Sequence, residues 1–204
     1  MGPRKRAQSG QIREESRARL VRAARGLFAS KGFFACKVGD IAREAGMSQG
    51  NVYWHFSSKE EILQEILAEG FGAAELMTAE VADASGPGRR KLDLLIERSL
   101  GLYSEYSDFV RILGTLMGHG GQELMASLGF NMGEIGGRYH ANLERVFAQA
   151  RREKAVADVE PNLLALFYFS FFNGALITYS DLWPQLDPTL VRQTVLRMLG
   201  AARS

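Results

Sequence analysis

Apolar residues recur every three or four positions through most of the chain, the spacing that places them on one face of an α-helix. Within the stretch from about Ile12 to Lys31 this face is formed by five residues, and Gly32 follows where a helix would end. The five are Leu20, Ala23, Ala24, Leu27 and Phe28. The pattern predicts a first amphipathic helix over residues 12–31. Residues 1–11 have no apolar face, and we expect them to form a disordered basic arm.

Further helices are predicted directly after the first. Residues 38–45 carry apolar side chains on one face, and Ser48 stands where it can cap a short helix that runs to Phe56. The two serines at 57–58 each precede a glutamate by three positions, which is the spacing of a capping box. We therefore expect another helix over residues 59–82.

The segment Ala84-Ser-Gly-Pro-Gly88 is the clearest break in the helical pattern. Beyond it helical spacing returns, although glycines between Gly118 and Gly137 interrupt it. We predict helices over residues 89–117, 134–153, 161–179 and 187–200, with Pro161 and the pair Asp187-Pro188 marking the last two starts. Strand-like alternation and internal repeats are absent from the sequence, so the predicted fold class is all-α with about nine helices.

The stretch from Asn162 to Ser180 contains 19 residues without a charge, which raises a membrane span as an alternative. Polar residues dilute its apolarity, however, and the flanking Glu160 and Asp181 are acidic where Lys or Arg anchors would be expected. A helix that is apolar on all sides in a soluble protein must be buried on all sides. We therefore favour a helix that a second subunit covers, with no membrane partner.

The 204 residues are 46% hydrophobic and 24% charged, which is typical of a globular chain of one or two domains. The single cysteine, Cys36, excludes an internal disulfide framework and a cysteine-only zinc site, so we expect a reducing, cytoplasmic location. The three histidines, His55, His119 and His140, lack metal-ligand spacing, and the sequence contains no nucleotide-binding or hydrolase motif. We therefore expect neither an enzyme nor a bound metal or cofactor.

The net charge of +2 hides an uneven distribution. Residues 1–56 carry 11 Lys and Arg against 4 Asp and Glu, a net +7, and the remaining 148 residues carry 14 against 19, a net −5. A basic first quarter before an acidic remainder is expected when one module meets a polyanion and the other does not. On charge alone, a solvated helix face rich in Arg is the alternative.

Residues 38–56 fit a helix-turn-helix, in which two short helices meet at a steep angle. The residue where the helices approach must be small, and the turn must tolerate a positive φ angle. Ala42 and Gly46 meet these two demands, four positions apart. The apolar residues available for the inner faces of both helices are Val38, Ile41, Ala45, Met47 and Val52.

The second helix of this motif begins with three candidate base-reading residues, Gln49, Gly50 and Asn51. The N-terminal end of such a helix reaches base edges in the major groove, where amide side chains pair with adenine. Around it stand groups suited to contact phosphate: Lys37, Ser48, Tyr53, Trp54, His55 and Lys59. The alternative for the aromatic residues is a place in the core, which we favour for Phe56 and leave open for Trp54.

Two stretches of the first quarter read Ala24-Arg-Gly-Leu27-Phe28-Ala-Ser-Lys-Gly32-Phe33 and Ile41-Ala42-Arg-Glu-Ala45-Gly46-Met47-Ser48-Gln-Gly50-Asn-Val52-Tyr53-Trp-His55-Phe56-Ser-Ser-Lys59-Glu60. They resemble the DNA-binding domain of TetR-type transcriptional regulators. That pattern is Ala-x-x-Leu-Phe-x-x-x-Gly-Phe, then Ile-Ala-x-x-Ala-Gly-Val-Ser-x-Gly-x-Leu-Tyr-x-His-Phe-x-x-Lys-Glu. The resemblance covers residues 17–63, about a quarter of the chain, and a weaker similarity includes Asp158-Val-Glu-Pro161 and Asn173-Gly174.

The resemblance implies a two-domain, all-helical homodimer. A helix-turn-helix domain over residues 12–58 would bind operator DNA, and residues 59–204 would form a ligand-sensing and dimerisation domain, with helix 59–82 connecting the two. The implied function is a transcriptional regulator, a repressor that a small molecule releases from its double-stranded operator. Two departures concern the helix over residues 38–45. Lys37 follows Cys36 where the family usually has Thr or Ser, and Gly39 stands where a larger contacting residue is common.

The resemblance also implies where subunits and effector bind. The family's last two helices form its dimer interface, for which the candidate residues here are Phe169, Phe172, Leu176, Val191, Val195 and Met198. Polar groups within the apolar helices of the second domain are candidates to line a pocket for a small, apolar effector. They are Tyr103, Tyr106, His119, His140, Tyr168 and Asn173. The alternative for each of them is a place in the core.

Two other functions remain as alternatives. An enzyme would need a clustered set of acids, bases or metal ligands, of which His119 with Glu123 is the nearest approach. A helical protein-interaction module is separated from a regulator by salt-dependent binding to promoter DNA. In a regulator, the basic residues of the arm, Arg4, Lys5 and Arg6, would add nonspecific attraction to DNA or reach an adjacent minor groove.

Overall fold

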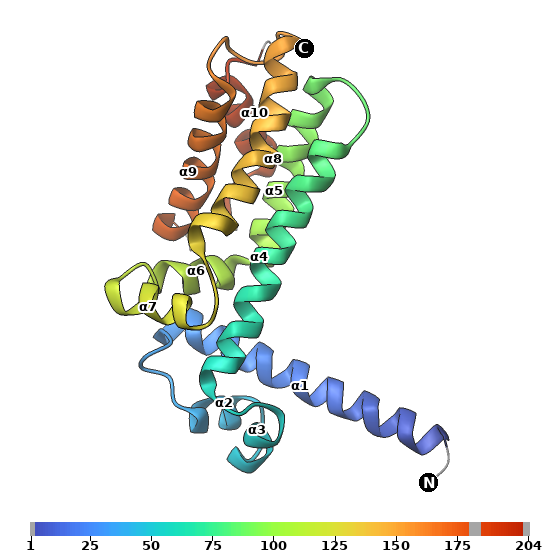
Figure 1. Ribbon diagram of the computed structural model, residues 1–204, viewed down its shortest axis with the longest axis vertical. Helices are drawn as coiled ribbons and strands as arrows, with labels where there is room; N and C mark the ends of the chain where they lie inside the picture. The colour runs from blue at the N-terminus through green and yellow to red at the C-terminus, as the bar shows by residue number, and fades with distance from the viewer. Residues whose placement is uncertain (1–2, 180–184, 202–204) are drawn as a thin grey trace.

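The computed structural model describes residues 3–179 and 185–201 of the chain. Within these ranges it contains ten α-helices and no strand, so the predicted all-α fold class is confirmed, with one helix more than expected (Figure 1). The helices are α1 Pro3–Lys31, α2 Val38–Glu44, α3 Gln49–His55, α4 Lys59–Asp83, α5 Gly88–Glu105, α6 Ser107–Thr115, α7 His119–Ser127, α8 Met132–Arg152, α9 Pro161–Tyr179 and α10 Pro188–Met198.

Helix α1 begins much earlier than its apolar face predicts. It runs without interruption from Pro3, so residues 3–11, which we expected to be disordered, are helical. The first two residues of that arm lie outside the described residues, as do the side chains of Arg4, Lys5 and Arg6. The physical reason for the difference is that helical spacing of apolar residues marks only the part of a helix that packs, whereas Pro is well suited to the first turn of a helix.

Helix α4 connects the two parts of the molecule (Figure 1). Near its first turns it packs against α1, and further along it packs against α5 and α8. Helices α8 and α9 lie side by side in the larger C-terminal bundle, and α10 packs on α5. Helix α6 lies across the lower end of this bundle and packs on α1, so the bundle rests directly on the N-terminal helices.

The expected single helix over residues 89–117 is two helices in the structure. The chain turns at Tyr106 (φ −108°, ψ 25°), so that α6 leaves the direction of α5. After Gly118 a further helix, α7, occupies a region that the glycines had led us to expect as irregular. Helix α8 begins at Met132, two residues before the predicted start, because the side chain of Asn131 accepts hydrogen bonds from the backbone N–H groups of Gly133 and Glu134.

One continuous core runs through both parts of the molecule. Its largest fully buried side chains include Phe28 and Phe56 at the N-terminal end and Phe147 and Phe172 in the bundle. Polar groups in the core are hydrogen-bonded: the Tyr168 hydroxyl donates to Ser99 Oγ at 2.8 Å, and Lys91 Nζ donates to the Ala82 carbonyl at 2.7 Å. This core fixes the positions of the two sites described next.

Candidate nucleic-acid interface and ligand cavity

The turn between α2 and α3 has the geometry that the sequence predicts. Gly46 adopts a positive φ of 63°, a conformation that side chains with a Cβ rarely adopt. The next amide, Met47 N–H, donates to the Ala42 carbonyl at 2.8 Å and closes the turn. Ala42, Ile41 and Ala45 are buried beneath the turn, so the two short helices are held at a fixed angle.

Helix α3 presents its N-terminal end to solvent. Ser48 Oγ accepts a hydrogen bond from the Asn51 N–H at 3.2 Å and caps the helix. Val52 and the following Phe56 are buried against the core, and this leaves the candidate base-reading residues, Gln49, Gly50 and Asn51, all exposed. The exposure of these three residues is what a recognition helix requires.

The aromatic residues at the end of α3 differ in their exposure to solvent. Phe56 is buried, as favoured, whereas Tyr53 and Trp54 are 56% and 63% exposed. The alternative of a core role for Tyr53 and Trp54 is therefore wrong. The guanidinium of Arg13 lies 5.0 Å from the centre of the Trp54 ring, which brings the long N-terminal part of α1 next to the end of α3.

A shallow hollow lies between the starts of α2 and α3 on the same face. Lys37, Gly39, Gln49 and Tyr53 contribute to its wall. Lys37 is exposed at the start of α2, where its backbone N–H donates to the Asp40 carboxylate at 3.1 Å. That hydrogen bond, with nearby Lys31 and Arg43, lowers the pKa of Asp40, so this carboxylate remains charged within a mainly basic surface.

Of the predicted phosphate ligands, Lys59 is engaged within the protein, and His55 is partly buried. Lys59 Nζ donates to the carbonyls of Phe33 and Cys36, both at 2.8 Å, and lies 4.1 Å from the centre of the Phe33 ring. Two of its three N–H groups thus hold the segment between α1 and α2. The Nδ1 atom of His55 is buried without a hydrogen-bond partner among the described residues.

Arg17 is a structural residue of this domain that sequence reasoning missed. It donates from Nη1 to the His55 carbonyl at 2.8 Å, forms an ion pair with Glu65, and lies 4.0 Å from the centre of the Phe56 ring. Its position one helical turn from Arg13 is the signal that could have suggested a shared face of α1. Arg13 and Arg17 together fasten α1 across the end of α3.

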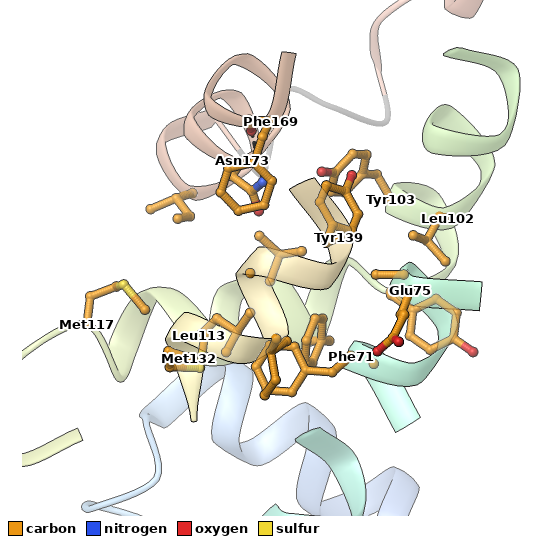
Figure 2. A pocket seen from close by; sticks show the side chains of 18 residues that line it. Phe71, Glu75, Leu102, Tyr103, Leu113, Met117, Met132, Tyr139, Phe169 and Asn173 are labelled. Atoms are coloured by element: carbon orange, nitrogen blue, oxygen red, sulfur yellow. Dashed lines mark hydrogen bonds between the residues drawn. The ribbon is translucent and has the colours of Figure 1, made fainter. Parts of the chain in front are cut away.

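The C-terminal bundle encloses a cavity of about 210 Å³ between α4, α5, α6, α8 and α9 (Figure 2). Its wall is mainly apolar and aromatic. The lining residues are Gly70, Phe71, Ala74, Glu75, Leu102, Tyr103, Tyr106, Phe109, Val110, Leu113, Met117, Met132, Ile135, Gly136, Tyr139, Phe169, Asn173 and Ile177. An apolar cavity with few polar groups is the form that small-molecule sites take.

The cavity brings together half of the predicted pocket residues. Tyr103, Tyr106 and Asn173 line it, whereas Tyr168 is buried beside Ser99 and His140 lies elsewhere on α8. The side chain of His119 lies outside the described residues. Tyr168 and His140 do not line this cavity. Helical spacing shows that a polar residue lies among apolar ones, but it does not show which side of the helix faces a cavity.

Tyr103, which was predicted to line the pocket, and Tyr139, which was not, face each other at one end of the cavity (Figure 2). The hydroxyls of Tyr103 and Tyr139 are hydrogen-bonded to each other. Burial raises the pKa of Tyr103 well above its ordinary value and the pKa of Tyr139 to about 12, so both are neutral hydrogen-bonding groups at physiological pH. Glu75, which sequence reasoning also missed, forms an ion pair with Arg138 at 2.9 Å.

Both of the last two helices carry exposed apolar residues, but these are only partly the residues that we expected. Phe172 and Val195, predicted to form the dimer interface, are buried inside the chain's own core. Phe169, also predicted there, is partly exposed and lines the cavity as well. Val191 is half-buried, Met198 is 65% exposed, and the side chain of Leu176 lies outside the described residues. The exposed apolar and aromatic residues of these helices that were not predicted are Leu163, Leu166, Phe167, Ile177, Tyr179 and Leu190.

Helix α9 is also long and apolar enough to cross a membrane by length and composition, and about a quarter of its apolar window is buried within the chain. A core helix of a soluble protein passes the same test. Exposed apolar residues are also found at Leu186, before α10, and at Leu190 within it.

Residues 20–66 match the family model described as "Bacterial regulatory proteins, tetR family". The HTH-type transcriptional regulator SrpR of Pseudomonas putida is 46% identical over 55 residues, which are 27% of this chain and 26% of SrpR. The matches to the curated relatives span about a quarter to two fifths of their length.

Two solved structures share the fold over nearly the whole chain. The ketosteroid transcriptional regulator KstR2 of Mycobacterium tuberculosis has a TM-score of 0.73 and 22% identity, with 92% of this chain and 95% of that chain covered. FadR of Bacillus subtilis, in complex with stearoyl-CoA, has a TM-score of 0.67 and 19% identity, with 92% and 98% covered. Fold and N-terminal sequence together define the class: a helix-turn-helix protein of two helical parts. The N-terminal part of the chain is thus similar to the DNA-binding domain of TetR-family regulators, and its overall fold is shared with solved transcriptional regulators.

Proposed function

We propose that the chain is a ligand-responsive transcriptional regulator that binds double-stranded operator DNA through α3 and is released by a small apolar molecule. The observation that carries the proposal is the exposed, capped start of α3, with Gln49 and Asn51 presented on the basic quarter of the chain. Side-chain amides at the start of a recognition helix read base edges, and surrounding cations bind phosphate.

The proposed function also requires that two copies of the chain bind DNA together as a dimer. Two recognition helices engage two half-sites only if a dimer holds them about 34–36 Å apart or at a suitable multiple. The exposed apolar residues of α9 and α10, among them Phe167 and Met198, supply a surface for such a homodimer. A second copy covers this surface without a membrane, which fits a cytoplasmic protein.

The cavity supports a small and uncharged effector. Its volume of about 210 Å³ is below the ~300–1,000 Å³ usual for ligand sites. Among its described lining residues Glu75 is the one carboxylate, already paired with Arg138, and none is Lys or Arg. A buried carboxylate ligand would lack a cationic partner, so we favour a neutral apolar molecule that hydrogen-bonds to Tyr103, Tyr139 or Asn173. Of the regulators that share this fold, KstR2 is a ketosteroid regulator, and FadR is in complex with stearoyl-CoA, which joins an apolar acyl chain to a charged CoA group.

A route from the cavity to the DNA-binding helices runs through α6. Phe109, Val110 and Leu113 of α6 line the cavity, and α6 packs on α1. Gln64 Nε2 donates to the Leu128 carbonyl at 2.9 Å, and Arg25 is paired with Glu69, so α4 is held on both sides of this junction. A ligand that favours a different packing of α6 would alter the spacing of the two recognition helices, which is the behaviour of a repressor released by its effector.

Binding to duplexes at several salt concentrations tests the proposal. Gln49→Ala and Asn51→Ala should reduce the preference for the best sequence selected from a random pool over unrelated duplex. Lys37→Ala and Tyr53→Phe should weaken both duplexes alike, and Lys37→Ala should reduce the salt dependence by about one phosphate contact. Binding that is independent of salt and of sequence in the unmodified protein would contradict the proposal and would favour a protein-interaction module.

A further inference from the structure

Gly39 of α2 and Gln49 of α3 lie against each other at the edge of the hollow between the two helices. The side-chain nitrogen Nε2 of Gln49 is 2.6 Å from the position that a Cβ atom would occupy at residue 39, and its Cδ is 3.6 Å away. A Cβ atom does not approach a nitrogen this closely, so the observed conformation of Gln49 requires a glycine at position 39.

The backbone gives no other reason for a glycine there. Gly39 lies inside a helix and is not among the described residues with positive φ, so a residue with a side chain could adopt its conformation. Glycine in a helix is unfavourable relative to alanine because it loses more conformational freedom on folding. What the glycine provides is space, and Gln49 occupies that space.

The chemistry of Gln49 makes its direction important. A glutamine carboxamide donates and accepts at once and can pair in a bidentate manner with the edge of adenine. Here the carboxamide lies across the start of α2, beside Lys37 and Tyr53 in the wall of the hollow, and Gln49 remains exposed. Position 39 itself offers no side chain to a base.

We propose that Gly39 is a positioning residue that determines the sequence preference of the DNA-binding surface through Gln49. It makes no contact with a base, and it decides which base the Gln49 carboxamide can reach. The inference rests on the DNA binding proposed above and adds to it a residue of α2 that acts through a residue of α3.

The substitution Gly39→Ala separates this role from folding. The atom that must move is the far end of a flexible side chain, so the domain should fold with Gln49 turned away from α2. Affinity for unrelated duplex should be unchanged, because phosphate contacts are unaltered. Preference at one position of each half-site should change by about tenfold, the size expected for one bidentate contact.

The test uses the full chain and duplexes that it selects from a randomised pool. Base preference is measured for the unmodified protein, Gly39→Ala, Gln49→Ala and the double variant, with Gly26→Ala as the control because a Cβ at residue 26 meets nothing within 4 Å. If Gly39 acts through Gln49, Gly39→Ala changes preference in the unmodified protein and has no effect in the Gln49→Ala background.

Each outcome has a distinct meaning. Additive effects of the two substitutions, or an unchanged preference in a folded Gly39→Ala variant, would overturn the role of Gly39 while leaving DNA binding intact. If Gly39→Ala fails to fold by circular dichroism, the steric account of a freely moving Gln49 is wrong. The absence of any enriched sequence with the unmodified protein would overturn the proposed DNA binding itself.

Discussion

Gly70 of α4 lies directly against the ring of Phe109 of α6. A Cβ atom at residue 70 would come within 2.3 Å of the ring carbon Cδ2 and within 2.5 Å of two more ring carbons. Phe109 is buried and lines the cavity, and its helix packs on α1. The close approach of α4 and α6 therefore lies between the cavity and the contact that α6 makes with α1.

We expect Gly70→Ala to destabilise the protein by about 1–3 kcal/mol, the cost of forcing extra volume into a packed core. The Phe109 ring is buried and cannot turn out into solvent, as the exposed Gln49 side chain can. It must therefore move into the cavity or push α6 away. Urea unfolding measures the effect. Gly72→Ala is the matched control, since a Cβ there meets nothing within 4 Å, and it should raise stability by about 0.5–1 kcal/mol. Equal effects of the two substitutions would contradict this role of Gly70.

The buried pair Tyr168 and Ser99 gives a second prediction. The Tyr168 hydroxyl donates to Ser99 Oγ at 2.8 Å, and both side chains are buried. Tyr168→Phe should lower the free energy of unfolding by about 1–2 kcal/mol, because it leaves the serine hydroxyl without this partner. Adding Ser99→Ala should recover part of the loss. Tyr179→Phe, at an exposed position of the same helix, should have no measurable effect, and a similar loss there would contradict the account.

The elements that the sequence predicted well are those with local signals. Ser48 before α3 and the Asp187-Pro188 pair before α10 mark helix starts through contacts within three residues, and both starts were placed correctly. The turn at Tyr106 was missed because it depends on the packing of α6 against α1. That contact is distant in sequence, and no local pattern near Tyr106 indicates it.

In the candidate sites too, features set by neighbouring residues could be predicted, whereas features set by distant contacts could not. The exposure of Gln49 and Asn51 could be predicted because the apolar residues of a short helix fix its inner face. The internal role of Lys59 could not, since its carbonyl acceptors on Phe33 and Cys36 lie 26 and 23 residues away. For α9, a helix apolar on all sides has no periodicity that separates a buried residue such as Phe172 from an exposed one.

His55 leads to a prediction about pH. Burial of its ring lowers its pKa, and the nearby charges of Arg13 and Arg17 lower it further. The unfolded chain therefore binds more protons than the folded chain just below the ordinary histidine pKa. The free energy of unfolding should consequently fall as the pH falls through about 6.5. His55→Gln should show a smaller fall between about pH 7.5 and pH 5.5, measured by urea unfolding. An identical pH dependence in both proteins would show that His55 does not contribute.

The exposed apolar residues of α9 and α10 give the last prediction. Phe167 and Met198 are 61% and 65% exposed in the single chain, and a second copy would remove them from water. Phe167→Asp and Met198→Asp should therefore give monomers by analytical ultracentrifugation. Because neither side chain belongs to the buried core, each monomer should keep its helical content and should still unfold cooperatively.

Leu76→Asp is the control for these dimer variants, since Leu76 is equally exposed but lies on α4. It should leave the oligomeric state unchanged. Monomeric variants should also lose affinity for a two-half-site duplex far more than for a single half-site, because only a dimer engages both recognition surfaces at once. If both aspartate variants remain dimers, the dimer interface lies elsewhere on the chain. If the unmodified chain is a monomer, these residues do not mediate self-association, and the dimer account is wrong.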